Sequence, residues 1–287
     1  MPPVWFITGA SNGFGLSLCL RALKAGHNVI GTMRKKSKAA QALKSIEDAG
    51  GKVFELDMTE PQASVAKKVQ DAEAIYGKID VLVNNAGYSL LGPIELFTEE
   101  EANRQIQTNL FGPLYAIQAV LPGMRSRRSG TIVNISSVAG QDGLATCGLY
   151  AASKFALEGL SESLAREGAE FGISVLIVEP GGFRTNFLNA MVVNEKGLGE
   201  KNEYQGTQVD KTIQNFAAYN GKQQGDPEKG AERIWGAVTG EGQGGQVKGK
   251  VLRLPLGKDC FERISQKVDQ VKKDLEMTQS LAFSTDI

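Results

Sequence analysis

The sequence lacks the features that mark membrane proteins and nucleic-acid-binding proteins. No apolar run in its 287 residues approaches the roughly 18 residues that a membrane-spanning helix needs. Its 32 Lys and Arg residues equal its 32 Asp and Glu residues, so the formal net charge is zero. Such a chain has no basic field to attract nucleic acid or anionic lipid. We therefore expect neither a membrane span nor a nucleic-acid partner.

Cysteine and histidine are also scarce. The three scattered cysteines, Cys19, Cys147 and Cys260, form neither a disulfide framework nor a zinc motif. The single histidine, His27, follows a helix-ending glycine, and we expect it to be an exposed turn residue. It carries no hydrolase or zinc motif, so we expect no metal. Because no signal-type segment precedes the first apolar run, the expected location is cytoplasmic.

A glycine-rich turn lies near the start of the chain. The apolar run 4–7 is followed by Thr8-Gly9-Ala10-Ser11-Asn12-Gly13-Phe14-Gly15, and a helical pattern then continues to residue 26. Strand, glycine turn and helix are the context of a phosphate-binding turn. The helix N-terminus there offers free N–H groups and a positive dipole end. A tight turn without a ligand is the alternative interpretation.

Short apolar runs and helical patterns alternate over most of the chain. Strands are expected at 4–7, 29–33, 52–56, 79–83, 130–135, 173–178 and 251–254. This rhythm predicts an α/β fold: a Rossmann-like doubly wound parallel sheet of about seven strands with helices on both faces. We expect a single domain spanning 1–287.

The rhythm breaks after Thr185. The mixed segment 186–225 is expected to be a substrate loop or lid. A C-terminal helix is predicted at about 257–277. Its apolar residues follow 3-4-3-4 spacing and form one stripe: Phe261, Ile264, Val268, Val271 and Leu275. We expect this stripe to dock on the protein's own body, with partner binding as the alternative.

A tyrosine and a lysine stand four residues apart in the predicted helix that begins near residue 149. Tyr150 and Lys154 share a helix face, and a nearby cation should lower the pKa of the phenol. A tyrosine with a lowered pKa can act as general acid or base. Taken alone, the pair has an alternative interpretation as two surface residues without a catalytic role. The alternative for Asn109 is a polar helix residue that faces solvent. Ser136 and Ser137 end a strand, at the sheet edge where α/β proteins bind ligands.

A basic cluster follows the second strand. No acidic residue occurs from His27 through Ile46, although NAD-binding sites usually place one there. Arg34, Lys35 and Lys36 stand there instead, which favours the 2′-phosphate of NADP. The alternative is a solvated basic turn.

Six motifs in order resemble those of one enzyme family. They are Thr8-Gly9-x-x-x-Gly13-x-Gly15, Asn84-Asn85-Ala86-Gly87, Asn109, Ser137, Tyr150-x-x-x-Lys154 and Pro180-Gly181-x-x-x-Thr185. The chain resembles the compact soluble branch of the short-chain dehydrogenase/reductases. It is most similar to NADP-preferring members that act on lipophilic or polyketide-like ketones and alcohols. The family serine stands thirteen residues before the tyrosine, which selects Ser137 over Ser136.

The resemblance implies a role for each motif residue. Ser137 and Tyr150 would hold the substrate oxygen, Tyr150 would exchange its proton, Lys154 would lower the phenol pKa, and Asn109 would support Lys154. The cofactor would be NADP. It would contact Tyr150 and Lys154 together with Gly9, Ser11, Asn12, Gly13, Phe14, Gly15, Arg34, Lys35, Asp57, Met58, Asn85, Ala86, Gly87, Pro180, Gly181, Phe183 and Thr185.

The predicted function is an NADP(H)-dependent oxidoreductase that acts on a small lipophilic carbonyl or alcohol substrate. An NADP(H)-binding dehydratase or isomerase, or a non-catalytic NADP(H) sensor, remains an alternative. A lipophilic pocket is expected from Leu90, Leu91, Leu144, Phe183, Phe187 and Met191. The resemblance also implies a homodimer or homotetramer through the helices that hold Asn109 and Tyr150. Alternatively, the terminal helix covers that surface and leaves a monomer.

Overall fold

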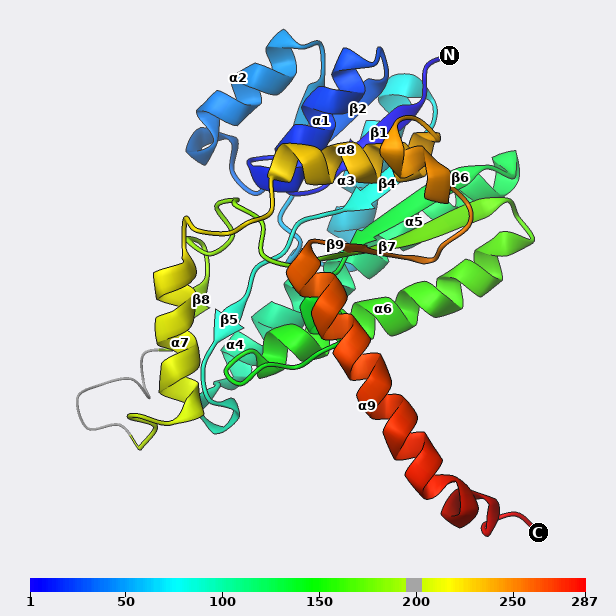
Figure 1. Ribbon diagram of the computed structural model, residues 1–287. Helices are drawn as coiled ribbons and strands as arrows, with labels where there is room; N and C mark the ends of the chain where they lie inside the picture. The colour runs from blue at the N-terminus through cyan, green and yellow to red at the C-terminus, as the bar shows by residue number, and fades with distance from the viewer. Residues whose placement is uncertain (195–202) are drawn as a thin grey trace.

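The computed structural model describes residues 1–194 and 203–287. A parallel sheet of seven strands forms its centre, in the order β3-β2-β1-β4-β6-β7-β9 (Figure 1). The strands are β1 (Val4–Ile7), β2 (Asn28–Met33), β3 (Lys52–Glu55), β4 (Val81–Asn84), β6 (Gly130–Ile135), β7 (Ile173–Pro180) and β9 (Arg253–Leu256). The predicted doubly wound α/β fold is therefore confirmed.

Helices cover both faces of the sheet. One face packs against α1 (Gly13–Lys24), α2 (Ala40–Asp48) and α8 (Pro227–Thr239), and its core includes Trp5, Leu18 and Trp235. The other face packs against α3 (Gln62–Tyr76), α5 (Gly112–Arg127) and α6 (Gly148–Ala169), and its core includes Phe6 and Leu164. All four residues of β1 are buried, because a central parallel strand has no solvated face.

His27 is not the exposed turn residue that its position predicted. Its Nδ1 accepts a hydrogen bond of 3.0 Å from Trp5 Nε1, and its ring lies 4.8 Å from that of Trp235. Burial lowers the pKa of His27. His27 therefore packs against Trp5 near the N-terminal end of β1, whereas the glycine turn follows the C-terminal end of that strand.

Asn109 lies in an interrupted helix. Helix α4 (Glu99–Ile106) ends in a π-turn, Gln107–Phe111, before α5 begins. Such π-turns are frequent at functional sites. Asn109 is fully buried, so its interpretation as a solvent-facing residue is wrong.

The segment after Thr185 contains more regular structure than its sequence indicated. The strand β8 (Val192–Val193) pairs in parallel with β5 (Leu90–Leu91), and α7 (Gln208–Tyr219) follows. Residues 195–202 of the expected lid lie outside the described residues. At α8, Asp226 caps the helix by accepting N–H groups from Glu228 and Lys229, and Pro227 stands at its first position.

The C-terminal helix differs most from expectation. Helix α9 (Lys258–Phe283) contacts the body only through its first turns and projects away from it (Figure 1). Every residue from Gln266 to Ile287 is exposed, so the prediction that its stripe docks on the protein's own body is wrong. In the part of the chain that the structure describes, none of the helices has the length and apolar character to span a membrane.

Candidate active site

The glycine turn between β1 and α1 has a backbone that side chains would block. Gly9 and Gly13 have φ of +69° and +53°, a region that favours glycine. A Cβ on Gly15 would stand 2.4 Å from the carbonyl oxygen of Gly9, so α1 can approach the turn only without one. No side chain caps the α1 N-terminus at Asn12, and no acid stands in the first turn. The N–H groups there suit an anionic group.

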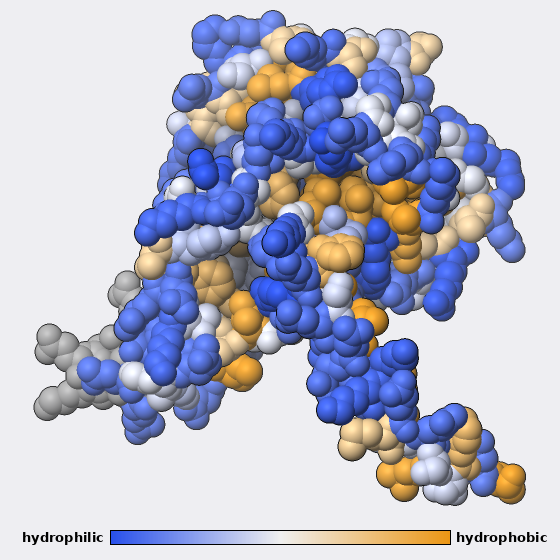
Figure 2. Space-filling view, viewed as in Figure 1, coloured by the Kyte–Doolittle hydropathy of each residue, from blue (hydrophilic) through white to orange (hydrophobic). Residues whose placement is uncertain are grey.

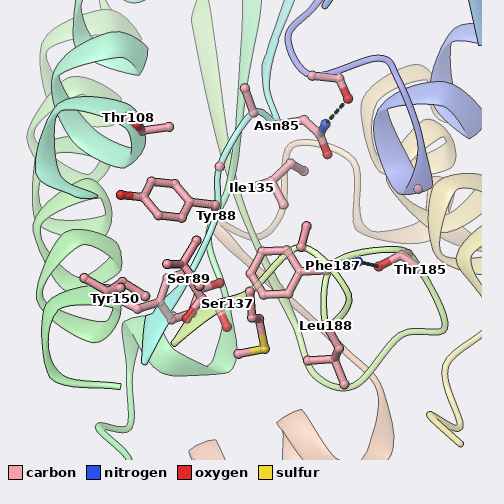
Figure 3. A pocket seen from close by; sticks show the side chains of 18 of the residues that line it. Asn85, Tyr88, Ser89, Thr108, Ile135, Ser137, Tyr150, Thr185, Phe187 and Leu188 are labelled. Atoms are coloured by element: carbon pink, nitrogen blue, oxygen red, sulfur yellow. Dashed lines mark hydrogen bonds between the residues drawn. The ribbon is translucent and has the colours of Figure 1, made fainter. Parts of the chain in front are cut away.

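The Asn84–Gly87 motif fixes this turn from the next strand. The Thr8 hydroxyl accepts N–H groups from Asn85 and Ala86, both at 3.0 Å. Asn85 Nδ2 donates to the carbonyl oxygens of Thr8, at 2.9 Å, and Gly9, at 3.1 Å (Figure 3). The two motifs therefore form one rigid unit at the carboxyl ends of β1 and β4.

One cavity of about 1150 Å³ connects the glycine turn with the Tyr150 region. Of the predicted site residues, it is lined by Gly9, Ser11, Asn12, Gly13, Phe14, Arg34, Lys35, Asp57, Met58, Asn85, Ala86, Gly87, Ser137, Tyr150, Lys154, Pro180, Gly181, Phe183 and Thr185. Gly15 and Asn109 do not line it, and both are buried.

Ser137 and Tyr150 meet at one wall of the cavity (Figure 3). The Ser137 hydroxyl accepts the N–H of Ala139 at 3.1 Å and lies near enough to the Tyr150 phenol to lower its pKa. Ser136 points elsewhere, because its hydroxyl donates to the buried carboxylate of Glu158. The two neighbouring serines therefore have different partners, and the assignment of Ser137 to the site stays a prediction.

The ionisation of Tyr150 departs from expectation. Burial raises the pKa of Tyr150 to about 12, and the neighbouring Ser137 hydroxyl opposes only part of that rise. Lys154 Nζ lies 5.8 Å from the centre of the Tyr150 ring. The predicted lowering of the phenol pKa by Lys154 is therefore absent from the structure, because desolvation of the phenolate outweighs a cation at that distance.

Lys154 is held by the sheet. Its ammonium donates to the carbonyl oxygen of Ile135 at 2.8 Å, and burial lowers its pKa to about 8 against the opposing charge of Glu158. Asn109 Nδ2 donates to the Tyr88 carbonyl oxygen and the Ser153 hydroxyl, each at 3.0 Å. A Cβ added at Gly87 would stand 3.2 Å from Asn109 Oδ1 and 3.6 Å from Lys154 Nζ, so these groups crowd around Gly87.

A family model described as short chain dehydrogenase matches residues 3–196, more than half of the chain. The chain belongs to the short-chain dehydrogenase family. It is 41% identical over 203 residues to a 3-ketodihydrosphingosine reductase from Bacteroides thetaiotaomicron, covering 71% of this chain and 72% of that protein.

Two solved structures extend the comparison. A short-chain dehydrogenase from Streptomyces avermitilis is 38% identical and superposes over 100% of both chains with a TM-score of 0.87. A metagenomic short-chain oxidoreductase in complex with NADP is 33% identical, with 63% of this chain and 83% of that chain covered and a TM-score of 0.59. Membership in this oxidoreductase family supports a nicotinamide cofactor.

The residues of this short-chain dehydrogenase fit such a cofactor. The open cradle at Gly9 and Gly13 and the uncapped α1 N-terminus suit a pyrophosphate, and the cavity continues from there to Tyr150. The buried side-chain amide of Gln223, on the cavity wall, has no hydrogen-bond partner within residues 1–194 and 203–287. Over the same ranges, no group of three or more His, Cys, Asp or Glu side chains is placed to hold a metal ion.

Apolar side chains gather in the part of the cavity beside Tyr150. Leu90, Leu144, Phe183, Phe187 and Met191 line it as predicted. Leu91, the second residue of β5, is buried and does not line it. Phe187 stacks at a tilt 5.8 Å from the Tyr150 ring, and Leu188 lies beside it (Figure 3).

Sequence reasoning missed the contribution of α9 to this wall. The Asp259 carboxylate accepts the N–H of Gly182 at 2.7 Å, and the Arg263 guanidinium binds Asp142 Oδ2 through two hydrogen bonds of 2.9 and 2.6 Å. Both α9 residues line the cavity. Their partners lie 77 and 121 residues away in the chain, and no local sequence pattern indicates such pairings.

Proposed function

We propose that this chain is an NADP(H)-dependent oxidoreductase that interconverts a lipophilic ketone and a secondary alcohol. The observation that carries the proposal is the meeting of the Ser137 and Tyr150 hydroxyls on one wall of a cavity that is also lined by the apolar side chains of Leu90, Phe187 and Met191. Two hydroxyl donors at one point can hold a carbonyl oxygen and stabilise the charge that develops on it. The nicotinamide, when bound, supplies or accepts the hydride.

Tyr150 is the proposed proton donor. Because burial raises the pKa of Tyr150 to about 12, its phenol is neutral near pH 7 and carries the proton that ketone reduction requires. The Lys154 ammonium lies 5.8 Å from the centre of the ring and favours negative charge on the phenol oxygen as the proton leaves. We propose that Asn109 holds the backbone around Lys154 in place by donating hydrogen bonds to the carbonyl oxygen of Tyr88 and the hydroxyl of Ser153.

The preference for NADP over NAD is proposed from the end of β2. Met33, Arg34 and Lys35 line the cavity there, and Lys38 adds a third cation. Arg34 and Lys35 are exposed, and neither forms an ion pair within the described residues. A guanidinium that is free to turn can bind a 2′-phosphate with paired hydrogen bonds.

A lipophilic substrate is proposed from the cavity wall beside Tyr150. Phe187 and Met191 come from the 186–225 segment, the proposed lid, and Phe216 of α7 completes that side. The name of the similar 3-ketodihydrosphingosine reductase accords with a lipophilic ketone. An apolar wall facing two hydroxyls would orient a long-chain ketone with its carbonyl toward Ser137 and Tyr150.

The test is oxidation of NADPH against a panel of ketones of increasing chain length, with the alcohol product identified by mass spectrometry. The proposal predicts stoichiometric alcohol formation that improves with chain length. Proton exchange or water loss without NADPH oxidation would instead indicate a dehydratase or isomerase. Tight NADPH binding without turnover of any ketone would indicate a non-catalytic sensor. Either result contradicts the proposed reaction.

A homo-oligomer through α5 and α6 also remains a proposal. Phe111, in the π-turn, is 40% exposed, and Phe155 of α6 is 45% exposed, which is unusual for aromatic side chains and supports an interface. The alternative in which α9 covers this surface is not supported, because α9 projects away from the body (Figure 1). Both aromatic rings are exposed.

A further inference from the structure

Helix α9 carries an uncovered apolar stripe on an arm that leaves the body. Its 26 residues make it about 39 Å long at 1.5 Å per residue. Phe261 is 64% exposed, Val268 57%, Val271 43% and Leu275 66%. Figure 2 shows apolar side chains along this arm and on the body beside its base. A stripe of this kind, exposed in an isolated chain, marks an interaction surface.

The spacing of the stripe is that of the contact line between two helices in a coiled coil, which we call the seam. Its apolar positions alternate by three and four residues from Phe261 through Ile264, Val268 and Val271 to Leu275. With Thr278 and Ala282 the same spacing continues to the end of the helix. A strict 3-4 repeat is the narrow stripe of a coiled coil, whereas a helix that docks on a globular body has a wider apolar face.

The charges of α9 argue against a lipid surface. The helix contains five basic and five acidic residues, so it carries no net charge toward anionic lipid. The two charges that flank the seam on one side are opposite in sign: Lys267 stands next to Val268, and Asp274 stands next to Leu275. Opposite charges at equivalent flanking positions are complementary when the same helix pairs with itself in the opposite direction.

We propose that α9 pairs with the α9 of a second copy of this chain as an antiparallel two-helix seam. In the best register, Val268 packs against Val271 of the partner subunit, and Ile264 packs against Leu275 of the partner subunit. Lys267 then faces Asp274 of the partner subunit, and the two-fold symmetry repeats this pair. Side chains tilt toward the N-terminus of their own helix, which brings these two charges together.

Other arrangements of the two arms lose this complementarity. A parallel pair would set Lys267 against Lys272 of the partner subunit. An antiparallel pair shifted by one heptad would set Asp274 against Asp274 of the partner subunit. In both cases like charges face each other across the seam, which is unfavourable. The charge pattern therefore selects one direction and one register.

Where α9 leaves the body, an apolar hollow can accommodate the C-terminal end of the partner helix. An apolar hollow of about 260 Å³ lies between β9 and α9, lined by Pro255, Phe261, Ile264, Ser265, Val268 and Asp269. In the proposed register, Leu281 of the partner subunit lies beside Lys258, at the mouth of this hollow. Leu281 is itself 69% exposed, so both surfaces lack a cover in the isolated chain.

Charge substitutions test the pairing and its direction. Lys267→Glu or Asp274→Lys alone should weaken self-association about tenfold, because each turns two attractive pairs into repulsive ones. An equimolar mixture of the two variants should recover association, because both pairs become attractive in the mixed dimer. Lys273→Glu makes the same charge change on the outer face and is the matched control. Sedimentation velocity at micromolar concentration gives the dissociation constants, and circular dichroism verifies the fold.

Cysteine cross-linking gives an independent readout that an interface at α5 and α6 would not produce. Val268→Cys mixed with Val271→Cys should form a disulfide-linked mixed dimer, and neither variant alone should cross-link. The three natural cysteines are buried and do not interfere. Cross-linking of Val268→Cys with itself, stronger association of Lys267→Glu, or no cross-link at all would overturn the proposal. Flotation of the wild type with phosphatidylcholine vesicles in the absence of a cross-link would assign the stripe to lipid and overturn it too.

Discussion

Lys154 donates its hydrogen bond to the carbonyl oxygen of Ile135, 2.8 Å away, and not to the phenol of Tyr150. The ammonium is thereby fixed to the end of β6, 5.8 Å from the centre of the tyrosine ring. This anchoring leaves the phenol free to face Ser137 and the cavity. Lys154 and Tyr150 therefore interact electrostatically without a direct hydrogen bond. Burial raises the pKa of Tyr150 and lowers that of Lys154.

The first prediction concerns the alkaline side of the pH–rate profile. Burial lowers the pKa of Lys154 to about 8, so its ammonium loses the proton as pH rises through that value. Without this charge, negative charge on the Tyr150 oxygen is less favourable, so kcat/KM for ketone reduction should fall above about pH 8. Glu158→Gln removes the carboxylate that raises the Lys154 pKa and should shift the fall to lower pH.

The matched control is Glu162→Gln, which removes a more exposed carboxylate bound to the same Arg253. It should leave the position of the alkaline limb unchanged. A profile of the wild type that stays level up to about pH 10, the ordinary range for lysine and tyrosine, would contradict the role given to Lys154.

The second prediction concerns stability. Burial and the neighbouring Glu158 carboxylate raise the pKa of Glu179 from 4.5 to about 7. The folded state then binds more protons than the unfolded state between these values, so the free energy of unfolding should fall as pH rises from about 4.5 to 7. Glu179→Gln should flatten this dependence in urea titrations. An unchanged slope would show that Glu179 titrates normally.

The third prediction concerns cofactor choice. The wild type should prefer NADPH over NADH by at least about tenfold in kcat/KM, mainly through KM, because charged hydrogen bonds contribute roughly 1.5–3 kcal/mol each. Arg34→Ala should reduce the ratio, and Met33→Asp with Arg34→Ile should reverse it. Lys36→Ala is the control, since Lys36 does not line the cavity. Equal use of both cofactors by the wild type would contradict the predicted NADPH preference and would indicate that the basic cluster is only a solvated turn.

The fourth prediction concerns the lipophilic wall. Phe187→Ala should raise KM for long-chain ketones while leaving that of acetone-sized ketones nearly unchanged, because the lost apolar contact involves only the chain. Burial of each methylene contributes about 0.8 kcal/mol, so the effect should grow with chain length until the wall is spanned. Steady-state kinetics on the ketone panel measures it. A uniform loss for short and long ketones would instead place Phe187 in the support of Tyr150.

The sequence predicted the elements whose patterns are local. The buried run Val4–Ile7 and the turn that ends at Gly15 were identified because period, glycine spacing and helix onset lie within a few residues. The π-turn at Gln107–Phe111 was missed because a π-turn differs from an α-helix by one inserted residue and leaves no apolar break.

Properties that depend on tertiary surroundings could not be predicted. The raised pKa of Tyr150 results from burial by the folded cavity, and a Tyr-Lys spacing reports only the nearby cation. The Asp259 and Arg263 contacts join α9 to loops far away in the chain. The arm itself was predicted as a helix, but its stripe has the same spacing whether it is covered by the body or by a partner.

The rate at which the Tyr150→Phe variant reduces a long-chain ketone tests the proposed function most directly. The substitution removes the proton donor while keeping the ring that packs on Phe187. NADPH affinity, measured by fluorescence titration, should remain near that of the wild type, and turnover of a long-chain ketone should fall about 10²- to 10⁴-fold, the usual contribution of general acid catalysis. Turnover of the variant at a rate close to that of the wild type would contradict the assignment of Tyr150 and with it the proposed mechanism.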